Sequence, residues 1–250
     1  MDLHKLREKF NRYLKENNIW LSRQRLDYSL RQYFRGLNLE GRSVLEIGAG
    51  EGLSCVWCVL HGADKVVALE PEASGSTKGM KRGFEKMAEA TDLKGKVDYL
   101  PIAFGDYLNK NQSRSFDYIL MQAVINHLDE EATKCLHLPE AEAERQQYRD
   151  TFKRMFDILK PNGVVVIYDV GRRNFWHDLK LKNPFSPTIE YDKHQQPKMW
   201  NELLCQAGFE SIDTKWFTIY KLRHLRLLLS YWLPTYFLNS AFILRCKKPA

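Results

Sequence analysis

Apolar residues in the first 34 positions recur every three or four residues, and the pattern then changes to short apolar runs between polar stretches. The first series covers residues 3–14, and the second covers residues 21–34. This spacing places the apolar side chains on one face of a helix. The pattern therefore predicts two helices, with a break at Asn17 and Asn18.

From Gly41 onward, short apolar runs alternate with amphipathic stretches. The runs predict strands at Ser43–Ile47, Lys65–Glu70, Val97–Pro101, Phe116–Met121 and Gly163–Tyr168, and the stretches predict helices at 53–60, 75–90 and 140–159. Strands that alternate with helices form a parallel sheet whose two faces are covered by helices.

The last third of the chain shows a different pattern. A helix is predicted at Met199–Ala207, and two runs rich in β-branched and aromatic residues, Ser211–Tyr220 and Tyr236–Lys247, predict a pair of antiparallel strands. Residues 227–244 contain no charged side chain, which raises the question of a membrane span. Pro234 and several polar residues interrupt this stretch, so the sequence favours a strand over a span. Shallow contact of residues 221–233 with a membrane surface is left open.

Length and composition restrict the class of protein. A chain of 250 residues with 12% aromatic residues forms one α/β domain and is not disordered. Five cysteines at irregular spacing, and charged residues throughout the first 35 positions, predict a cytoplasmic protein without a secretory signal or a disulfide framework. Cys55 and Cys58 have the spacing of a zinc or redox pair, but no second pair accompanies them. They are expected to pack in the core, and no metal site is expected.

The net charge of +7 lies entirely in the last third of the chain. Residues 1–170 contain 25 Lys and Arg and 25 Asp and Glu, whereas residues 171–250 contain 13 and 6. This asymmetry predicts an anionic substrate, a nucleic acid or an acidic membrane surface near that segment. A solvated basic face without a partner is the alternative.

A glycine-rich turn follows the first predicted strand, with glycines at Gly48, Gly50 and Gly52. Glycines allow a ligand to approach the main chain closely, and the helix that follows offers free N–H groups. Glu70 ends the second predicted strand and can accept hydrogen bonds from two ribose hydroxyls. Asp106, after the third strand, can accept one from an adenine amino group. The sequence therefore predicts a nucleotide pocket at the carboxyl edge of the sheet.

The spacing of the glycines separates two kinds of nucleotide. Dinucleotide sites use G-x-G-x-x-G, and this chain has G-x-G-x-G with Glu46 before it and Glu51 within it. Two carboxylates beside a pyrophosphate repel it, whereas they suit a ligand that carries an ammonium and a sulfonium. A nicotinamide dehydrogenase is therefore disfavoured.

Five short motifs follow one another over about residues 40–170, in the order in which they occur in one known enzyme family. They are Glu46–Gly52, Ala68–Pro71, Phe104–Asp106, Phe116–Ala123 and Leu159–Gly163. Together they resemble the class I S-adenosylmethionine-dependent methyltransferases. The resemblance implies a Rossmann-like fold, with a mostly parallel sheet of seven strands, an antiparallel last strand and helices on both faces. It also implies an N-terminal helical lid at 1–36 and a methyltransferase domain at 37–250 that uses S-adenosyl-L-methionine.

The resemblance also implies a role for each matching position. The residues expected to hold the cofactor are Glu46, Gly48, Ala49, Gly50, Gly52, Glu70, Pro71, Phe104, Asp106, Gln122 and Ala123. Glu46 would orient the turn or the ammonium, and Glu70 would hold the ribose. Asp106 would hold the adenine amino group, with Phe104 beside the ring.

A hydroxyl acceptor benefits from a general base. The candidates are His194, which we rank first, His127 after the fourth strand and Asp169 at the end of the fifth. Residues 171–235 are expected to contain the substrate-specifying inserts. The substrate-binding candidates there are Arg172, Arg173, Trp176 and Lys193.

The acceptor is the least defined part of the prediction. A weak resemblance to methyltransferases of glycan pathways favours a small molecule, with methylation at a hydroxyl oxygen of a sugar or glycan precursor. The chain lacks an Asn-Pro-Pro-Tyr/Phe element after the fourth strand, which makes methylation of nucleic-acid bases less favoured. An RNA methyltransferase and a non-catalytic S-adenosylmethionine-binding module are the alternatives.

Overall fold

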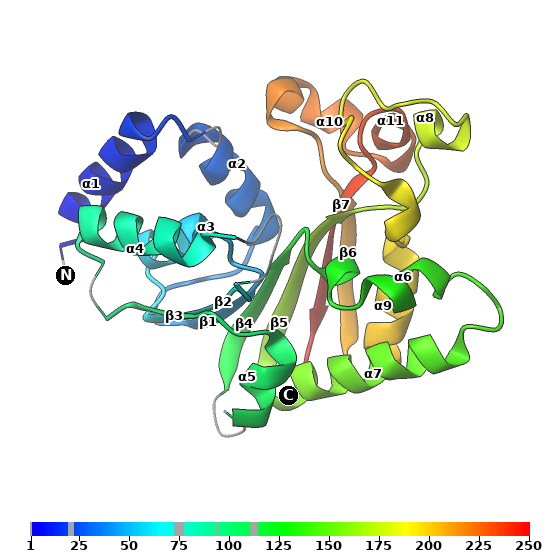
Figure 1. Cartoon of the computed structure of the whole chain (residues 1–250), viewed down its shortest axis with the longest axis horizontal. Coiled ribbons are helices and arrows are strands. Elements are labelled where there is room, and N and C mark those ends of the chain that lie inside the picture. Colours follow the sequence, from blue (N-terminus) through cyan, green and yellow to red (C-terminus); the bar gives the residue numbers. More distant parts are fainter. Residues whose placement is uncertain (1, 20–22, 73–77, 94, 111–114) are drawn as a thin grey trace. The chain divides into compact units, whose positions relative to one another are not determined.

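The computed structural model describes residues 2–19, 23–72, 78–93, 95–110 and 115–250. The chain divides into two compact units, Met1–Met121 and Gln122–Ala250 (Figure 1). The strands follow the order β3-β2-β1-β4-β5-β7-β6 in a seven-stranded sheet. This is the mostly parallel, seven-stranded Rossmann-like sheet that the family resemblance implies, and its last strand, β7, runs antiparallel.

The first unit contains four parallel strands. Its elements are α1 (Leu3–Glu16), α2 (Arg23–Tyr33), β1 (Ser43–Ile47), α3 (Leu53–Leu60), β2 (Lys65–Leu69), α4 (Met80–Thr91), β3 (Val97–Leu100), α5 (Phe104–Lys110) and β4 (Phe116–Gln122). Ile47 aligns with Leu69 of β2 and with Met121 of β4, and Leu69 aligns with Leu100 of β3. The carboxyl ends of the four strands therefore lie at one edge, where open α/β sheets bind ligands.

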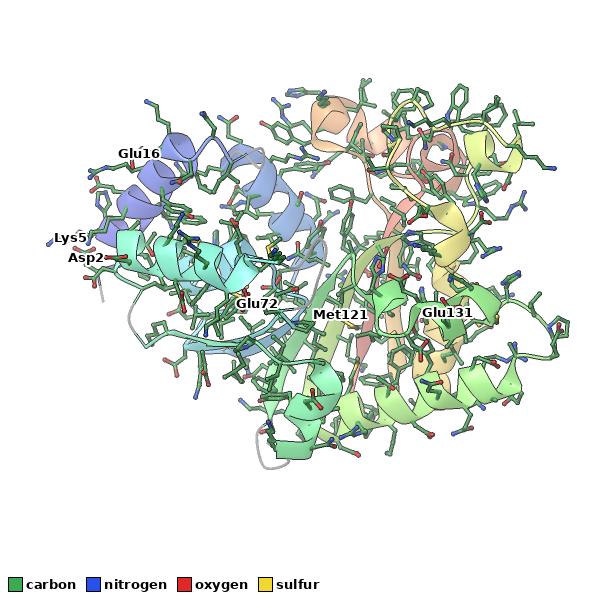
Figure 2. All side chains as sticks on the ribbon, in the orientation of Figure 1. Asp2, Lys5, Glu16, Glu72, Met121 and Glu131 are labelled. Carbon is green, nitrogen blue, oxygen red and sulfur yellow. The ribbon has the colours of Figure 1, made fainter. Side chains whose placement is uncertain are left out.

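The two N-terminal helices belong to the core of this unit. The side chain of Asp2 caps α1 by accepting hydrogen bonds from two N–H groups of its first turn (Figure 2). Leu6, Phe10 and Leu14 follow at helical spacing and are buried, because α1 packs against α3 and α4. Helix α2 packs against α3, where Trp57 donates from Nε1 to Asp27.

The second unit is built on three strands. Its elements are η1 (Ile125–His127), α6 (Glu130–Cys135), α7 (Glu142–Asp157), β5 (Leu159–Val170), α8 (Phe175–Asp178), η2 (Tyr191–Lys193), α9 (Pro197–Gln206), β6 (Glu210–Trp216), η3 (Tyr220–Leu225), α10 (Arg226–Leu229), α11 (Trp232–Phe237) and β7 (Ala241–Lys247). Strand β7 pairs antiparallel with β5 on one side and with β6 on the other. Helices α7 and α9 pack on these strands, with Trp200 and Phe152 buried between them.

The structure corrects the predicted elements mainly near Pro234. Residues 236 and 237 belong to helix α11, and strand β7 begins only at Ala241. The aromatic residues that suggested a strand pack instead around a short helix, where Trp232 stacks on Tyr236. Helix α4 begins at Met80 rather than at residue 75, and residues 75–77 lie outside the described part of the chain. Within that part, no helix is long and apolar enough to cross a membrane.

Candidate functional site

The turn between β1 and α3 is held against the end of β2. Gly48 and Ala49 both donate their N–H groups to the carbonyl oxygen of Leu69, at 2.8 and 3.0 Å. Gly50 has a φ of +54°, and a Cβ added to it would meet no atom within 4 Å. The turn therefore leaves open space beside its backbone, as close approach of a ligand requires. The hydroxyl of Tyr99 in β3 also holds the turn, because it donates a hydrogen bond to the Gly50 carbonyl at 2.8 Å.

Glu70 directly follows β2 and contacts the same turn. Its Oε2 accepts a hydrogen bond from the Gly50 N–H at 2.7 Å, which leaves Oε1 for another donor. Burial raises the pKa of this carboxyl, and the Gly50 N–H opposes that effect. A buried carboxylate at the carboxyl edge, beside an open glycine turn, fits the ribose of a nucleoside.

Glu46 takes a structural position inside β1. It is 1% exposed, and its two carboxylate oxygens accept hydrogen bonds from Ser54 Oγ and Cys55 Sγ in the first turn of α3. Burial, followed by the charge of Glu46, holds the pKa of the Cys55 thiol well above its usual range. Of the two roles expected for Glu46, the geometry fits the orientation of the turn.

Gly52 has a packing reason to be glycine. It caps α3 with a φ of +75°, and an added Cβ would lie 2.8 Å from the ring of Phe84. That ring stacks on Tyr99 at 4.4 Å between centroids, so it has little room to move. Gly52 thus allows α4 to approach the turn.

The remaining cofactor candidates occupy different environments. Phe104 is buried, whereas Asp106 is exposed in the first turn of α5. Asp106 follows the third strand, as the sequence predicts, and lies in the first turn of the short helix α5. Pro71 is exposed next to Glu70. In the second unit, Ala123 follows Gln122 with a φ of +52° and donates to the Tyr168 carbonyl at 2.7 Å. Such a backbone conformation costs energy for alanine and is concentrated at functional sites.

The three candidate bases lie together in the second unit. His194 is 8% exposed, and its Nδ1 lies 3.3 Å from Asp169 Oδ1 and 2.9 Å from Asn126 Nδ2. Asp169 is buried at the end of β5, and its Oδ2 has no hydrogen-bond partner among the described residues. The rings of His127 and His194 lie 6.2 Å apart, edge to face.

The hydrogen bonds around Asn126 determine the tautomer of His194. The Gln195 N–H donates to Asn126 Oδ1 at 3.1 Å, so the amide nitrogen faces His194. Asn126 Nδ2 therefore donates to His194 Nδ1, and a neutral imidazole must carry its proton on Nε2. In this state His194 can donate a hydrogen bond but cannot accept a proton at Nε2. This geometry does not favour His194, the highest-ranked candidate, as the general base.

His127 has the opposite arrangement. Its Nδ1 lies 2.8 Å from Glu130 Oε1, and this hydrogen bond holds the pKa of the Glu130 carboxyl below its usual range. An ionised carboxylate only accepts, so Nδ1 carries the proton and Nε2 presents a lone pair. No hydrogen bond within the described chain engages Nε2. This is the pairing of a carboxylate with an imidazole that general bases use.

Sequence reasoning missed three of these residues: Asn126, Glu130 and Gln195. Asn126 is fully buried, which an asparagine beside an apolar run does not reveal. Gln195 donates to the Thr133 carbonyl at 2.6 Å, a contact that links segments 62 residues apart. Only Glu130 had a local signal, because an acidic residue three positions after a histidine can meet it on a helical turn.

The expected substrate residues are mostly paired with other residues of the same unit. Arg173 donates to Asp178 from Nε at 3.1 Å and from Nη2 at 2.9 Å, and Arg172 donates to the Asp192 carbonyl. Lys193 forms an ion pair with Glu190 at 2.8 Å. Both arginines, which are candidates for binding an anionic substrate, thus already donate to other residues of this unit.

Trp176, the aromatic candidate for substrate binding, connects two helices. Its Nε1 donates to the Phe237 carbonyl, which ties α8 to α11. Its ring also lies edge to face against Phe175.

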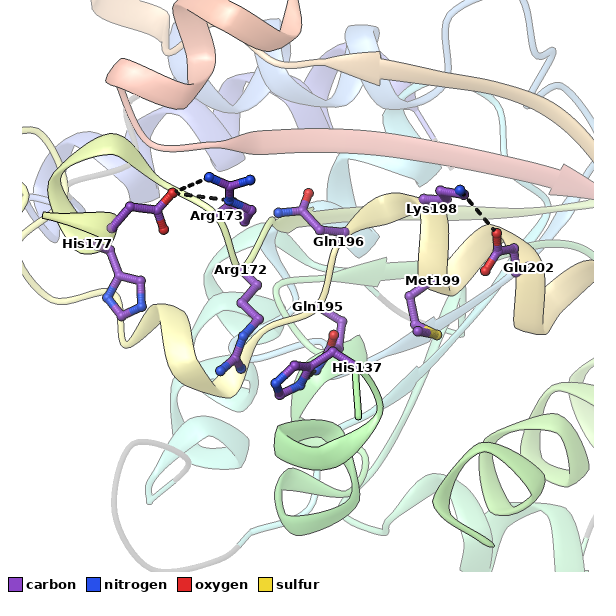
Figure 3. A pocket seen from close by; sticks show the side chains of 10 residues that line it. His137, Arg172, Arg173, His177, Gln195, Gln196, Lys198, Met199 and Glu202 are labelled. Carbon is purple, nitrogen blue, oxygen red and sulfur yellow. Dashed lines mark hydrogen bonds and ion pairs between the residues drawn. The ribbon is translucent and has the colours of Figure 1, made fainter. Parts of the chain in front are cut away.

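A cavity of about 550 Å³ opens beside Arg172 and Arg173 (Figure 3). It is lined by His137, Arg172, Arg173, His177, Asp178, Gln195, Gln196, Lys198, Met199 and Glu202. Gln195 connects it to the histidine cluster, since it follows His194 in the chain. Basic and amide side chains dominate the lining, so the cavity suits a polar or anionic molecule.

Known proteins resemble this chain in sequence and in fold. A family profile described as a methyltransferase domain matches residues 19–229. The chain is 29% identical over 181 residues to protein-lysine methyltransferase METTL21E of Mus musculus and of Bos taurus. The matched region is 62% of this chain, 71% of the mouse protein and 60% of the bovine protein.

Solved structures share the fold at low sequence identity. An S-adenosylmethionine-dependent methyltransferase from Mesorhizobium loti has a TM-score of 0.57 at 15% identity, over 89% of this chain and 100% of that one. The cyclopropane synthase MmaA2 from Mycobacterium tuberculosis has a TM-score of 0.58 at 15% identity, over 89% and 84%. The profile, the strand order and the glycine turn lead to one conclusion. The chain belongs to the methyltransferase domain family, as a class I enzyme whose cofactor is S-adenosyl-L-methionine.

Proposed function

We propose that the protein methylates a hydroxyl oxygen of a small, polar acceptor and that His127 is the general base. The observation that carries this proposal is the hydrogen bond between His127 Nδ1 and Glu130 Oε1 at 2.8 Å. It fixes the proton on Nδ1 and leaves Nε2 able to accept the proton of a hydroxyl. An amine acceptor that arrives unprotonated needs no such group.

The cofactor would be held by residues of the glycine turn and of the strand ends. Gly48, Ala49 and Gly50 would pass beside its methionine part, Glu70 Oε1 would accept from the ribose, and Phe104 and Asp106 would contact the adenine. Gln122 and Ala123 would contact the methionine end. The sulfonium of the bound cofactor supplies an activated methyl group and its own leaving group. The protein therefore has to align the acceptor, exclude water and remove one proton.

His194 and Asp169 would position the acceptor. The Nε2–H of His194 can donate to the acceptor oxygen, because Asn126 occupies Nδ1. The unpartnered Oδ2 of Asp169 is buried, and a buried polar atom without a partner costs stability until a donor reaches it. A second hydroxyl or an ammonium group would supply that donor.

The cavity supports a sugar-like or anionic acceptor. His137, His177 and Arg172 surround it, with Gln195 and Gln196 as hydrogen-bonding amides. The ion pair of Lys198 is exposed, and Arg172 pairs with the exposed Asp192. Ion pairs at the surface contribute little stability. Both cations could therefore turn to a carboxylate or phosphate.

A second candidate acceptor is a protein lysine. It is favoured by one observation, the 29% identity over 181 residues to proteins named as protein-lysine methyltransferases. A lysine acceptor would also need to lose a proton before it attacks, which His127 could accept.

One experiment separates the two acceptors. S-adenosylmethionine with a radiolabelled methyl group is incubated with the protein and a cell extract that has been divided into protein, RNA and small-molecule fractions. The proposal expects label in the small-molecule fraction, as an ether resistant to mild alkali, and loss of that label in His127→Asn. Label in methyl-lysine after protein hydrolysis would establish the second candidate. Label in RNA, or no label in any fraction, would contradict both.

A further inference from the structure

Large apolar side chains are exposed in two segments of the second unit, residues 179–185 and 225–237. Ten of the twelve exposed large hydrophobic side chains in the described chain lie there: Leu179, Leu181, Phe185, Leu225, Leu227, Leu228, Tyr231, Trp232, Leu233 and Phe237. Leu227 and Leu228 are 79% and 71% exposed. Exposed apolar side chains gathered in this way mark an interaction surface.

Hydrogen bonds and ring contacts join the two segments into one surface. Trp176 Nε1 donates to the Phe237 carbonyl at 2.9 Å, and Asn183 Nδ2 donates to the Leu238 carbonyl at 2.6 Å. The rings of Phe175 and Phe237 lie 4.7 Å apart. Helices α8, α10 and α11 accordingly lie side by side (Figure 1).

These segments and the residues just before the second one are basic. Lys180 and Lys182 lie in the first segment and Arg226 in the second, and Lys221 and Arg223 lie just before the second. Residues 179–189 and 217–237 contain no Asp or Glu, and no acidic side chain of the described chain lies within ion-pair distance of these five cations. The adjoining Asp178 is already paired with Arg173 and accepts from Tyr236. We call these five cations and the ten apolar residues the apolar-basic surface.

The form of this surface does not suit a small molecule or a groove-bound helix. None of its residues lines the cavity of about 550 Å³ or the smaller cavity of about 70 Å³ in the first unit. Leu227 and Leu228 lie on α10, and Trp232, Leu233 and Phe237 lie on α11, which are helices of four and six residues. Leucine, tryptophan and tyrosine beside lysine and arginine is the composition of segments that lie in a membrane interface.

We propose that the apolar-basic surface docks the protein on a membrane that contains anionic lipids. The exposed leucine and aromatic side chains enter the headgroup region, and the cations contact lipid phosphates. Charge complementarity favours this partner. A membrane with anionic lipids offers an apolar environment for the exposed leucine and aromatic side chains and negative charges for the five cations. The proposal is independent of the acceptor and of the catalytic residues.

The test is sedimentation of the full chain with lipid vesicles. Vesicles of phosphatidylcholine alone are compared with vesicles of phosphatidylcholine mixed with phosphatidylglycerol, at low and high salt. We expect binding only to the mixed vesicles, weakened by salt. Each cation near an anionic surface contributes about fivefold to binding. Lys221→Glu with Arg226→Glu should therefore weaken binding by at least about twentyfold.

Matched variants separate docking from loss of folding. Leu227→Glu with Leu228→Glu should abolish vesicle binding, while Leu3→Glu, at an exposed leucine of the first unit, should leave it unchanged. Lys5→Glu is the control for charge. Thermal unfolding and S-adenosylmethionine binding of every variant should match the wild type. The proposal is overturned if anionic vesicles do not bind the protein, or if the two leucine substitutions leave binding intact. It is also overturned if the only effect of those substitutions is to dissociate an oligomer of this chain.

Discussion

His127 Nδ1 lies 2.8 Å from Glu130 Oε1, three residues further along the chain at the start of α6. The neighbouring His194 instead receives a hydrogen bond at its Nδ1 from Asn126. Two histidines whose rings are 6.2 Å apart are therefore held in opposite tautomers. One can accept a proton at Nε2, and the other can donate a hydrogen bond there.

The first prediction concerns His127. His127→Asn should lower kcat by about a hundredfold or more, because a positioned base contributes that much to proton transfer. Glu130→Gln keeps a hydrogen-bond acceptor but removes the charge, so it should lower kcat less. Neither change should alter the Kd for S-adenosylmethionine, which calorimetry measures beside the steady-state rates. Wild-type turnover in His127→Asn, with inactivity in His194→Asn, would reverse the two assignments.

The second prediction concerns the tautomers themselves. Nitrogen NMR of imidazole-labelled protein should show His194 protonated at Nε2 and His127 protonated at Nδ1. His194→Gln and His127→Gln assign the two signals. Because the hydrogen bond from Asn126 keeps the proton of His194 on Nε2, Asn126→Leu should remove this preference for Nε2. The His127 signal should stay unchanged. Protonation of His194 at Nδ1 in the wild type would show that Asp169, rather than Asn126, orients this ring.

The third prediction concerns Gly52. Gly52→Ala places a Cβ 2.8 Å from the Phe84 ring at a φ of +75°, whereas Gly79→Ala has a similar φ of +85° and meets nothing within 4 Å. Backbone strain should cost both variants about 1–2 kcal/mol, and Gly52→Ala should lose about 1–3 kcal/mol more from overpacking. Urea denaturation measures both free energies of unfolding. Equal losses would mean that Phe84 yields and that the packing role of Gly52 is wrong.

The fourth prediction concerns the pH dependence of cofactor binding. Burial raises the pKa of Glu70 above 4.5, so the folded protein holds this proton at a pH where the unfolded chain has lost it. The group thus contributes stability at low pH, which is lost as the pH rises through the folded pKa. Cofactor binding needs the ionised carboxylate, so the affinity should fall as the pH drops through the same range. Calorimetry at several pH values measures it. Glu70→Gln should bind weakly and show no such fall, and an identical fall in this variant would assign the titration to another group.

Sequence patterns predict the first unit well because its elements are defined locally. Residues 43–47 and 53–60 have the bounds of β1 and α3, since a buried parallel strand and an apolar helix are both recognisable from a few neighbouring residues. The glycine turn and Glu70 were found in the same way, and the structure joins them at 2.7 Å.

The second unit was harder to predict because its contacts are between distant residues. The role of Asn126 depends on His194 and Gln195, about 70 positions away, and no periodicity reports such a contact. The strand predicted from Tyr236 includes the last two residues of the short helix α11, because aromatic residues are also typical of strands. The sequence does not reveal a partner for Arg173, and only the fold shows that Asp178 accepts hydrogen bonds from its Nε and Nη2.

The most direct test of the account is calorimetric binding of S-adenosylmethionine, S-adenosylhomocysteine and NAD to the wild type, Glu70→Ala and Glu72→Ala. Glu72 is the matched control, because it is an exposed glutamate two residues further along the chain. The account predicts that the wild type binds the first two ligands and not NAD. It predicts that Glu70→Ala binds them at least about tenfold more weakly and that Glu72→Ala binds like the wild type. Binding of NAD alone, or equal affinity in Glu70→Ala and the wild type, would contradict it.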